Sequence, residues 1–378
     1  MMSFMSRLRV LVSGLSSPGS AGSGICFTQT TMSIACKSPT HPKRCKTKRG
    51  LETEQLPPIM LYRFWGGGGS VEGLKVLLLV NPHASSVTAR TQVVIQKALA
   101  ADHDVTLAAT HRRGHASRLA HGAVADGCDA VAVLGGDGTL NEAINGLAGS
   151  DVALAPLPGG STNVFARTIG LPDDPVEAAA MLLETLAAGH IKRVGLGQVN
   201  GRYFLFHAGV GYDAAVVQQV ERRAGLKRYA NHALFAFAAV DTWLRHYDRS
   251  RPRFTVYHSD GEAVTGQFAI CLNTNPYTYL GSRPFDVMPD TTLDVPLSMV
   301  TLRSLRANRL LRVAASALGY GPPVTAHRHV HSHTGVTSVV VASDAPFPYQ
   351  LDGDYLGETT RLEFHHAANA LALALPLG

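Results

Sequence analysis

From residue 74 to residue 193, short apolar segments alternate with segments of helical periodicity, and this alternation constrains the fold more than any other feature. The first segment, Lys75–Val80, is a nearly continuous apolar run, which is typical of a strand buried on both faces. Strands are predicted at Lys75–Val80, Val105–Ala109, Ala130–Leu134 and Val152–Leu157, and helices at Thr91–Ala101, Ala116–Ala125, Thr139–Leu147 and Val176–Ala188. Because strands alternate with helices, residues 74–193 are expected to form an α/β domain with a parallel sheet.

The pattern changes after Arg193 to short strands and turns. The better strand candidates are Tyr203–Ala208, Phe254–His258, Gly266–Asn273, Ser338–Ala342 and Arg361–Phe364, and the helix candidates are Tyr229–Arg245 and Leu302–Ala317. We therefore expect residues 194–364 to form a β-rich, sandwich-like second domain. The alternating residues Leu371–Leu375 could return to either sheet, so residues 365–378 are candidates for completing the α/β domain.

Residues 1–73 have a composition unlike the rest of the chain. The formal net charge is +6, but residues 1–50 contain eight Lys and Arg side chains and no Asp or Glu, so the remainder has 26 basic and 28 acidic residues. The folded body therefore shows no charge bias toward nucleic acid as a partner. We interpret residues 1–73 as a basic, disordered extension that ends in the Gly-rich linker Gly66–Gly69. A transit peptide, or a translation start further along at Met60, is the alternative.

Hydrophobic runs and cysteines argue against a membrane span and a disulfide framework. The strongest run, Val76–Val80, is far shorter than the roughly 20 residues of a spanning helix. Three of the five cysteines lie in the extension, and Cys128 and Cys271 lack metal-binding or disulfide spacing. A reducing, cytoplasmic setting is expected.

Small-residue loops follow several predicted strands of the α/β domain. The most informative is Gly135-Gly136-Asp137-Gly138-Thr139, which opens into a helix. Uncovered backbone N–H groups and the dipole at a helix N-terminus favour a phosphate, and glycine allows it to approach closely. Asp137 could order the nucleotide or a Mg²⁺-bound water, whereas in isolation the segment would predict a tight turn with an N-capping Asp.

Two similar loops are Asn81–Ser85 and Pro158–Asn163. Each follows a predicted strand at its carboxyl end, where open α/β sheets bind ligands. No GxxxxGK[ST] phosphate loop occurs in the chain. The three loops together therefore indicate a nucleotide-phosphate site.

These motifs resemble the diacylglycerol kinase catalytic family, especially its soluble bacterial lipid kinases. The resemblance rests on Asn81-Pro-His-Ala-Ser85, Thr110 with Gly114-His115-Ala116, GGDGTLNEAING, PGGSTNVFAR and the late Gln350-Leu-Asp352-Gly-Asp354. Sphingoid-base and ceramide kinases share this pattern, whereas NAD kinases share only GGDGT. The resemblance implies an NAD-kinase-like α/β nucleotide-binding domain, a β-sandwich-like second domain and an active site in the cleft between them.

By the same resemblance, ATP and Mg²⁺ are the expected cofactors. The implied ATP-binding residues are Asn81, Pro82, His83, Ala84, Ser85, Thr110, Gly135, Gly136, Asp137, Gly138, Thr139, Leu140, Asn141 and Ser161. The family's catalytic base falls on Asp352, where a carboxylate near the lipid hydroxyl could orient it and accept its proton. Without the upstream loops, Asp352-Gly353 would predict only a hairpin turn. A structural Mg²⁺ site of bacterial members matches Asp294.

The sequence departs from the family pattern at four positions. Val164 stands where many members have Asp, which removes one carboxylate from the expected Mg²⁺–water network. Asp354 stands where Glu is usual, and Ser161 replaces Thr but keeps the hydroxyl. Val295 replaces the glycine that usually follows Asp294, which weakens the match to the metal loop.

The resemblance implies an ATP-dependent lipid kinase, with diacylglycerol as the favoured acceptor and phosphatidate as the product. A sphingoid-base or ceramide-type kinase and a catalytically impaired nucleotide-binding regulator are the alternatives. The expected partners are a lipid substrate and a membrane surface contacted peripherally from the cytoplasm, and a homodimer is a further option.

Three other patterns allow two interpretations each. Four histidines alternate over His327–His333, and a solvated strand face is favoured over a metal site because no carboxylate or cysteine accompanies them. Four arginines recur every three residues over Arg303–Arg312 on a predicted helix and suit an anionic membrane surface or solvent. The apolar segment Leu234–Trp243 favours core packing over a lipid groove.

Overall fold

The structure, a computed structural model, describes residues 73–222 and 232–377. The basic extension at residues 1–72 and the start of the predicted helix Tyr229–Arg245 lie outside the described residues. Within the described part, no helix is long and apolar enough to cross a membrane. Its two cysteines, Cys128 and Cys271, are free thiols.

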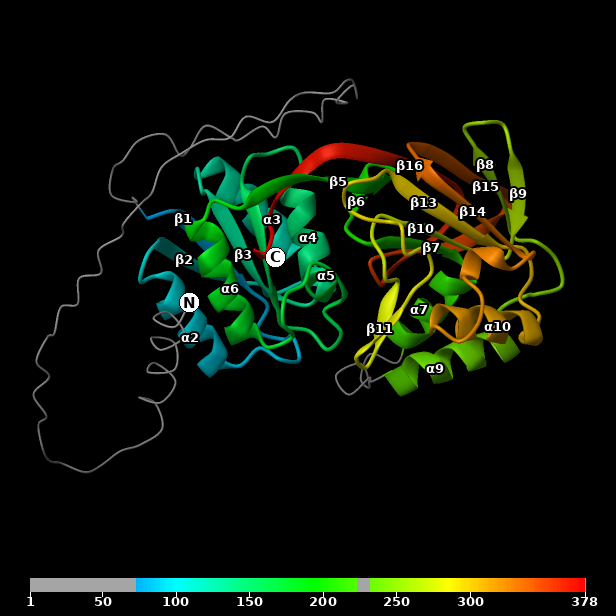
Figure 1. Cartoon of the computed structure of the whole chain (residues 1–378), viewed down its shortest axis with the longest axis horizontal. Coiled ribbons are helices and arrows are strands. Elements are labelled where there is room, and N and C mark those ends of the chain that lie inside the picture. The colour runs from blue at the N-terminus through cyan, green and yellow to red at the C-terminus, as the bar shows by residue number, and fades with distance from the viewer. Residues whose placement is uncertain (1–72, 223–231, 378) are drawn as a thin grey trace, which may run out of the picture. The chain divides into compact units, whose positions relative to one another are not determined.

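The first lobe is built on parallel strands in the order β2-β1-β3-β4 (Figure 1). The strands are β1 (Lys75–Val80), β2 (Asp104–Ala109), β3 (Ala130–Gly135) and β4 (Ala153–Pro158), and the helices are α2 (Ala89–Leu99), α3 (His115–Ala125), α4 (Asp137–Leu147), α5 (Val164–Thr168) and α6 (Pro175–Ala187). Leu77 of β1 shares a hydrophobic core with α3, α4 and α5, whereas its neighbour Leu78 shares another with α2 and α6. The sheet is therefore buried on both faces, which explains the continuous apolar runs in its strands.

The second lobe consists mainly of antiparallel strands, paired in the order β14-β13-β10-β7-β15-β16. Its strands are β5 (Ile191–Val199), β6 (Arg202–Phe204), β7 (His207–Gly211), β8 (Phe254–His258), β9 (Ala263–Gly266), β10 (Phe268–Leu272), β11 (Thr278–Leu280), β12 (Arg283–Phe285), β13 (Leu297–Leu302), β14 (Val330–Val336), β15 (Ser338–Leu351) and β16 (Asp354–Ala374), and its α-helices are α7 (Tyr212–Arg222), α9 (His232–Asp241) and α10 (Ala307–Ala317). Val256, Phe347 and Phe364 pack in its central core. An α/β lobe followed by a β-rich lobe confirms the predicted fold class.

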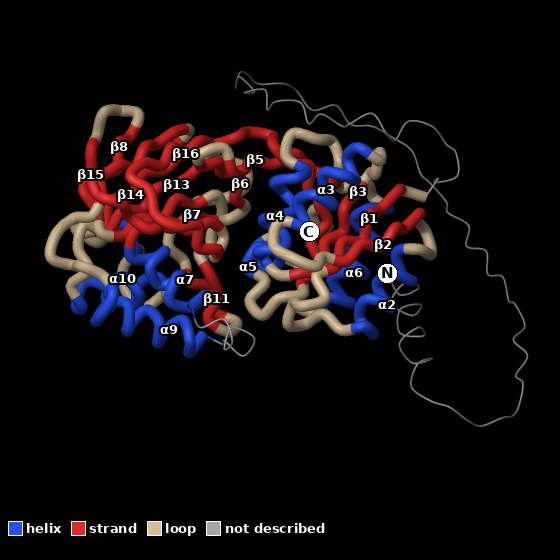
Figure 2. The backbone as a smooth tube through the Cα atoms, turned by 180° about the vertical axis from the view of Figure 1, so that it is seen from behind, coloured by secondary structure: helices blue, strands red, loops and turns tan. Residues whose placement is uncertain are grey.

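Strand β16 connects the two lobes. Over 21 residues it pairs with β15 and β5, and Leu373 pairs in parallel with Leu154 of β4 (Figure 1 and Figure 2). Its register with β5 shifts between Ala367 and Leu371, where Asn369 has a φ of 54°. The alternating C-terminal residues thus return to the α/β sheet, which is one of the two possibilities that the sequence left open.

The predicted helix Leu302–Ala317 is wrong in its first turn, because α10 begins at Ala307. Leu302 instead ends strand β13, where it pairs with Phe268 of β10. Of the four regularly spaced arginines, only Arg309 and Arg312 lie on α10. The predicted basic stripe is therefore half as long as its sequence spacing suggests.

Candidate active site

The three small-residue loops lie together at the carboxyl edge of the parallel sheet, and hydrogen bonds join them. Asn81 follows β1; its backbone N–H donates to the carbonyl oxygen of Leu134 at 2.9 Å, and its Nδ2 donates to Thr139 Oγ1 at 2.9 Å. The backbone N–H of Ser86 donates to the carbonyl oxygen of Gly159 at 2.9 Å. The first loop therefore contacts both of the others.

Glycines let the second and third loops approach each other backbone to backbone. A Cβ atom on Gly136 would lie 3.3 Å from Gly160 Cα, and one on Gly160 would lie 2.9 Å from Gly136 Cα. The N–H of Gly159 donates to the carbonyl oxygen of Gly135 at 2.8 Å. Larger residues would force the two loops apart.

Helix α4 begins at Asp137, directly after this contact, and its N-cap Gly136 offers no side chain to cap it. Backbone N–H groups and the positive end of the helix dipole are thus concentrated between the glycine loops. A helix N-terminus of this kind attracts phosphate oxygens. The geometry fits the predicted use of this loop.

Asp137 holds two loops together rather than facing a ligand. Its carboxylate accepts from the N–H groups of Val164 at 2.9 Å and Phe165 at 3.1 Å, at the start of α5. Burial raises the pKa of Asp137, and the two N–H groups act in the opposite direction. The side chain of Val164, where Asp is usual in the family, is buried in the hydrophobic core. This environment gives no support to the predicted ordering of a Mg²⁺-bound water by Asp137.

Glu142, which ends the GGDGTLNE segment, caps a neighbouring helix. Its Oε1 accepts from the N–H of Gly114 at 2.7 Å and its Oε2 from the N–H of Ala116 at 3.1 Å, at the start of α3. Gly114 has a φ of 77°, which glycine adopts without steric strain. Two motifs that are separate in the sequence therefore form one structural contact.

Asn141 joins the two lobes. Its side chain is fully buried; Nδ2 donates to Asp352 Oδ2 at 2.7 Å, and Oδ1 accepts from Arg202 Nη2 at 2.8 Å. The amide of Asn141 is thus occupied by protein partners. The contact of Asn141 with ATP stays a prediction, and the burial of the residue does not favour it.

Asp352 lies in the two-residue turn between β15 and β16. Asp352 and Gly353 have φ values of 47° and 81°, a pair of positive values typical of a type I′ hairpin turn. Besides Asn141, the carboxylate accepts from the backbone N–H groups of residues 205–207, at 2.7 to 3.1 Å. The residue is 4% exposed, and burial raises the pKa of Asp352 to about 6 against the opposing effect of these donors. The residue that matches the family's catalytic base therefore also lies in the hairpin turn. Its carboxylate oxygens accept hydrogen bonds from protein groups.

Asp354, at the start of β16, has a more open carboxylate. Its Oδ2 would lie 3.5 Å from a Cβ atom on Gly138, in the first turn of α4, and it lies 3.3 Å from Arg113 Nη2. The Asp354 side chain is 19% exposed. The sequence interpretation gave this residue no role, although its place in the Asp-Gly-Asp motif was an available signal.

A buried polar network behind the hairpin was not predicted. Asp213 accepts from Tyr277 Oη at 2.6 Å and from Gln350 Nε2 at 2.7 Å, and Gln350 Oε1 accepts from the N–H of Gly353 at 2.8 Å. Burial raises the pKa of Asp213 and of Tyr277. A Cβ atom on Gly209 would overlap the Asp213 carboxylate, so this glycine makes room for the network. Gln350 belongs to the late motif of the sequence, but no motif marks its partner Asp213, which lies 137 residues earlier.

The other predicted ATP-binding residues lie around the loop surfaces and beneath them. The side chains of Pro82, His83, Ser85 and Ser161 are exposed, Ala84 is half-buried, and Thr110 and Leu140 are buried. Thr110 N–H donates to the carbonyl oxygen of Val80 at 2.8 Å, and the side chain of Leu140 packs in the core. The ATP contacts of these residues stay predictions.

Asp294, the predicted ligand of a structural Mg²⁺, lies on the surface. Its side chain is 62% exposed, and its Oδ1 lies 2.5 Å from Lys192 Nζ. Among the described residues, three or more metal-ligating side chains come together only at Asp260, Glu262 and His333. The metal role of Asp294 stays a prediction, and its ion pair with a lysine does not favour it.

Comparisons with known proteins show similarity to lipid kinases. Residues 75–199 match the family model of the diacylglycerol kinase catalytic domain. A diacylglycerol kinase of Bacillus subtilis is 29% identical over 267 residues, which cover 70% of this chain and 84% of that protein. A protein of Chromohalobacter salexigens named "Probable lipid kinase YegS-like" is 33% identical over 46% of this chain and 54% of its own length.

A solved structure of a diacylglycerol kinase from Bacillus anthracis shares the fold. It aligns with a TM-score of 0.59 at 21% identity, over 81% of this chain and 98% of that chain. Residues 75–199 therefore carry a diacylglycerol kinase catalytic domain, which confirms the resemblance, and this match and the B. subtilis relative support a lipid kinase enzyme.

Proposed function

We propose that this enzyme transfers the γ-phosphoryl group of ATP to the hydroxyl of diacylglycerol and forms phosphatidate. The observation that carries the proposal is the connection of three phosphate-type loops in one lobe to an acid-bearing hairpin in the other, through Asn141 and Asp352. Phosphoryl transfer requires mainly positioning and charge stabilisation, and these elements can supply both. Diacylglycerol is favoured as the acceptor because the B. subtilis relative carries that activity in its name.

In this proposal, the phosphates of ATP lie between the N-terminus of α4 and the loops Asn81–Ser85 and Pro158–Asn163. Backbone N–H groups at the helix start donate to the phosphate oxygens. The exposed hydroxyls of Ser85 and Ser161 can add donors, and the Arg113 guanidinium can pair with phosphate from its place beside Asp354.

We assign Asp354 as the acceptor of the hydroxyl proton and Asp352 as a positioning residue. A general base must come within about 2.6–3.2 Å of the proton donor. The oxygens of Asp352 already accept four hydrogen bonds from the protein, whereas the Asp354 carboxylate is partly exposed beside α4. During transfer, the lipid oxygen bonds to the γ-phosphorus, the bond to the bridging oxygen of ADP breaks, and the proton passes to Asp354.

Mg²⁺ fits this site as a companion of the nucleotide. Proteins bind it through one or two carboxylates together with substrate phosphates and water. Val164 leaves the family position of one such carboxylate apolar, and Asp354 is assigned to the lipid hydroxyl, so phosphate oxygens and water would hold the ion here. When bound, the ion neutralises phosphate charge.

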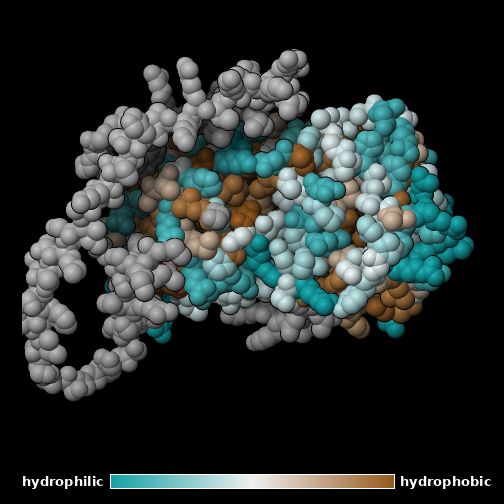
Figure 3. Space-filling model, viewed as in Figure 1, coloured by the Kyte–Doolittle hydropathy of each residue, from teal (hydrophilic) through white to brown (hydrophobic). Residues whose placement is uncertain are grey.

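An exposed apolar surface on α9 and the following turn supports a peripheral membrane contact. Its side chains, Phe235, Phe237, Val240 and Leu244, are 43% to 58% exposed. Hydrophobic surface is visible at the lower right of Figure 3. The expected core packing of Leu234–Trp243 is therefore wrong for Phe235, Phe237 and Val240. Apolar helix faces of this kind insert at a lipid interface. We expect the double substitution Val240→Ser/Leu244→Ser to weaken sedimentation with anionic vesicles and to leave activity on detergent-dispersed lipid unchanged.

A transfer assay with γ-labelled ATP tests the proposed acceptor. The panel contains diacylglycerol, monoacylglycerol, sphingosine and ceramide in mixed micelles, and NAD as a water-soluble acceptor. We expect label in phosphatidate above all other products. Preferred labelling of sphingosine or ceramide would replace the proposed acceptor, and ATP binding without any labelled lipid would favour a regulator.

A further inference from the structure

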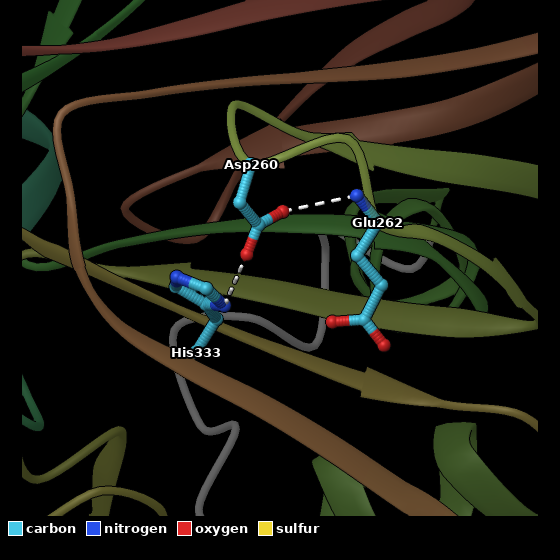
Figure 4. Close-up of side chains that lie close together, drawn as sticks. All are labelled: Asp260, Glu262 and His333. Carbon is cyan, nitrogen blue, oxygen red and sulfur yellow. Dashed lines mark hydrogen bonds and ion pairs between the residues drawn. The ribbon is translucent and has the colours of Figure 1, made fainter.

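A cluster of imidazoles and carboxylates lies in the β-rich lobe, on elements that form neither the three loops nor the acidic hairpin. Asp260 and Glu262 come from the turn between β8 and β9, and His333 comes from β14 (Figure 4). His331 lies on the same strand and pairs with Glu262. The prediction that the face of the alternating histidines lacks accompanying carboxylates is therefore wrong here. Two carboxylates from an earlier turn of the chain cover this face. Glu262, which contacts His331, precedes it by 69 residues.

The turn directs both carboxylates toward the two imidazoles. Asp260 Oδ1 accepts from the N–H of Glu262 at 3.0 Å, and its Oδ2 lies 3.9 Å from His333 Nδ1. The Glu262 carboxylate lies 2.9 Å from His331 Nε2. Ligand-type atoms of Asp260, Glu262 and His333 all lie within 4.8 Å of one another.

A third imidazole, that of His258 on β8, gives an independent indication. It is 6% exposed, and neither of its ring nitrogens has a hydrogen-bond partner. Its ring stacks on His333 at 4.8 Å between centroids with an interplanar angle of 24°, and it lies 5.4 Å from the His331 ring. Buried polar atoms without partners are rare, and His331 Nδ1 is a further one in the same cluster.

We propose that Asp260, Glu262 and His333 bind a divalent transition-metal ion, with Zn²⁺ as the best match. Two carboxylates supply the negative charge, and an imidazole nitrogen favours Zn²⁺ over Mg²⁺ or Ca²⁺, which prefer oxygen ligands alone. His331 acts as a positioning residue because it holds the Glu262 carboxylate, as partners of metal ligands commonly do. The ligating side chains are 35% to 50% exposed and can close around an ion with bonds of about 2.0–2.2 Å.

The ion would connect strands that do not pair with each other. β8 pairs with β15 and β9, whereas β14 pairs with β13. A metal between the β8–β9 turn and β14 would therefore cross-link the β-rich lobe and stabilise it against unfolding. The inference does not depend on the proposed lipid substrate, since it uses none of the residues assigned to phosphoryl transfer.

Isothermal titration of Zn²⁺ into the untagged, chelator-stripped full chain tests the site. We expect the wild type to bind one Zn²⁺ more than the isosteric double variant Asp260→Asn/Glu262→Gln, and Zn²⁺ to raise the melting temperature of the wild type alone. His331→Ala should weaken binding at this site by about tenfold. His329→Ala, which removes a nearby histidine outside the cluster, should bind as the wild type does.

Equal Zn²⁺ stoichiometry and affinity in the wild type and the double variant would overturn the proposal, as would the absence of saturable binding to the wild type. Circular dichroism checks that the double variant is folded. If it is not, the single variant His333→Gln takes its place, with Co²⁺ absorption as the readout. A Co²⁺ spectrum unchanged by His333→Gln would equally exclude this imidazole as a ligand.

Discussion

The two lobes contribute different kinds of groups to the active site. The α/β lobe offers backbone: Gly136 and Gly160 bring two loops into contact, and α4 begins between them with its N–H groups. The β-rich lobe offers side chains: Asp352 and Asp354 approach α4 from the turn of one hairpin. Phosphate binding thus depends on local loop conformation, whereas acceptor chemistry depends on contacts between distant parts of the chain.

The hairpin itself contains a second contrast. Asp352 is buried and accepts four hydrogen bonds, whereas Asp354 is partly exposed and lies next to a single guanidinium at 3.3 Å. Two carboxylates separated by one glycine therefore have separate functions in our account. Asp352 holds the hairpin against the first lobe, and Asp354 serves the reaction.

The largest expected effect is on ATP affinity and follows from Gly136→Val in the glycine loops of the α/β lobe. The new side chain would press on Gly160, so the two loops separate, and we expect ATP affinity to fall by about 100-fold or more. The matched control is Gly122→Ala in α3, where a Cβ atom meets nothing within 4 Å. ATP affinity of Gly136→Val within twofold of the wild type, measured by calorimetry, would contradict the assignment of this loop.

On the side-chain side, Asp352→Ala is expected to lower the free energy of unfolding by about 3 kcal/mol, because it leaves four buried donors without their acceptor. Urea denaturation measures this value. Asn369→Ala controls for backbone strain, since Asn369 has a similar φ of 54° and an exposed side chain. Equal losses in the two variants would mean that the hydrogen bonds of Asp352 contribute nothing beyond the turn.

The pH dependence of stability gives a finer test of Asp352. Its pKa of about 6 in the folded chain exceeds the value of about 3.9 expected when unfolded, so the folded state binds the proton more tightly. Its contribution to stability is therefore fully present below about pH 3.9 and is lost as the pH rises to about 6. Asp352→Asn should remove this part of the stability–pH curve. Curves of the same shape for both proteins would show that Asp352 does not titrate in this window.

A smaller effect on stability is expected where the Glu142 carboxylate caps helix α3. Glu142→Ala removes the acceptor of two N–H groups at the start of α3 and should cost about 1 kcal/mol of stability. Glu184→Ala, on the exposed face of α6, is the control and should change stability little. If Glu142→Ala lost ATP binding with unchanged stability, Glu142 would belong to the nucleotide site instead.

The sequence predicted the strands and turns of the α/β lobe well, because local patterns determine them. Continuous apolar runs marked β1, β3 and β4, and glycines marked the turns that follow β3 and β4. Asp352-Gly353 likewise marked a hairpin, because both residues readily adopt positive φ.

The side-chain contacts were not predictable in the same way, because their partners are far apart in the sequence. Asn141 was expected at ATP, yet its amide binds Asp352, 211 residues later. Glu142 was part of a motif whose chemistry suggested a ligand, yet its carboxylate caps α3. His333 lacked a carboxylate neighbour in the sequence and acquired one, Asp260, only through the fold.

The transfer rate of Asp354→Asn tests the central claim most directly. We expect kcat with diacylglycerol to fall by about 10²- to 10⁴-fold, because the proton acceptor is lost, while ATP affinity and stability stay near the wild type. Glu358→Gln, an exposed carboxylate on the same strand, should retain wild-type kcat. If folded Asp354→Asn kept wild-type kcat while Asp352→Asn lost transfer, Asp352 would be the base and the assignment made here would be wrong.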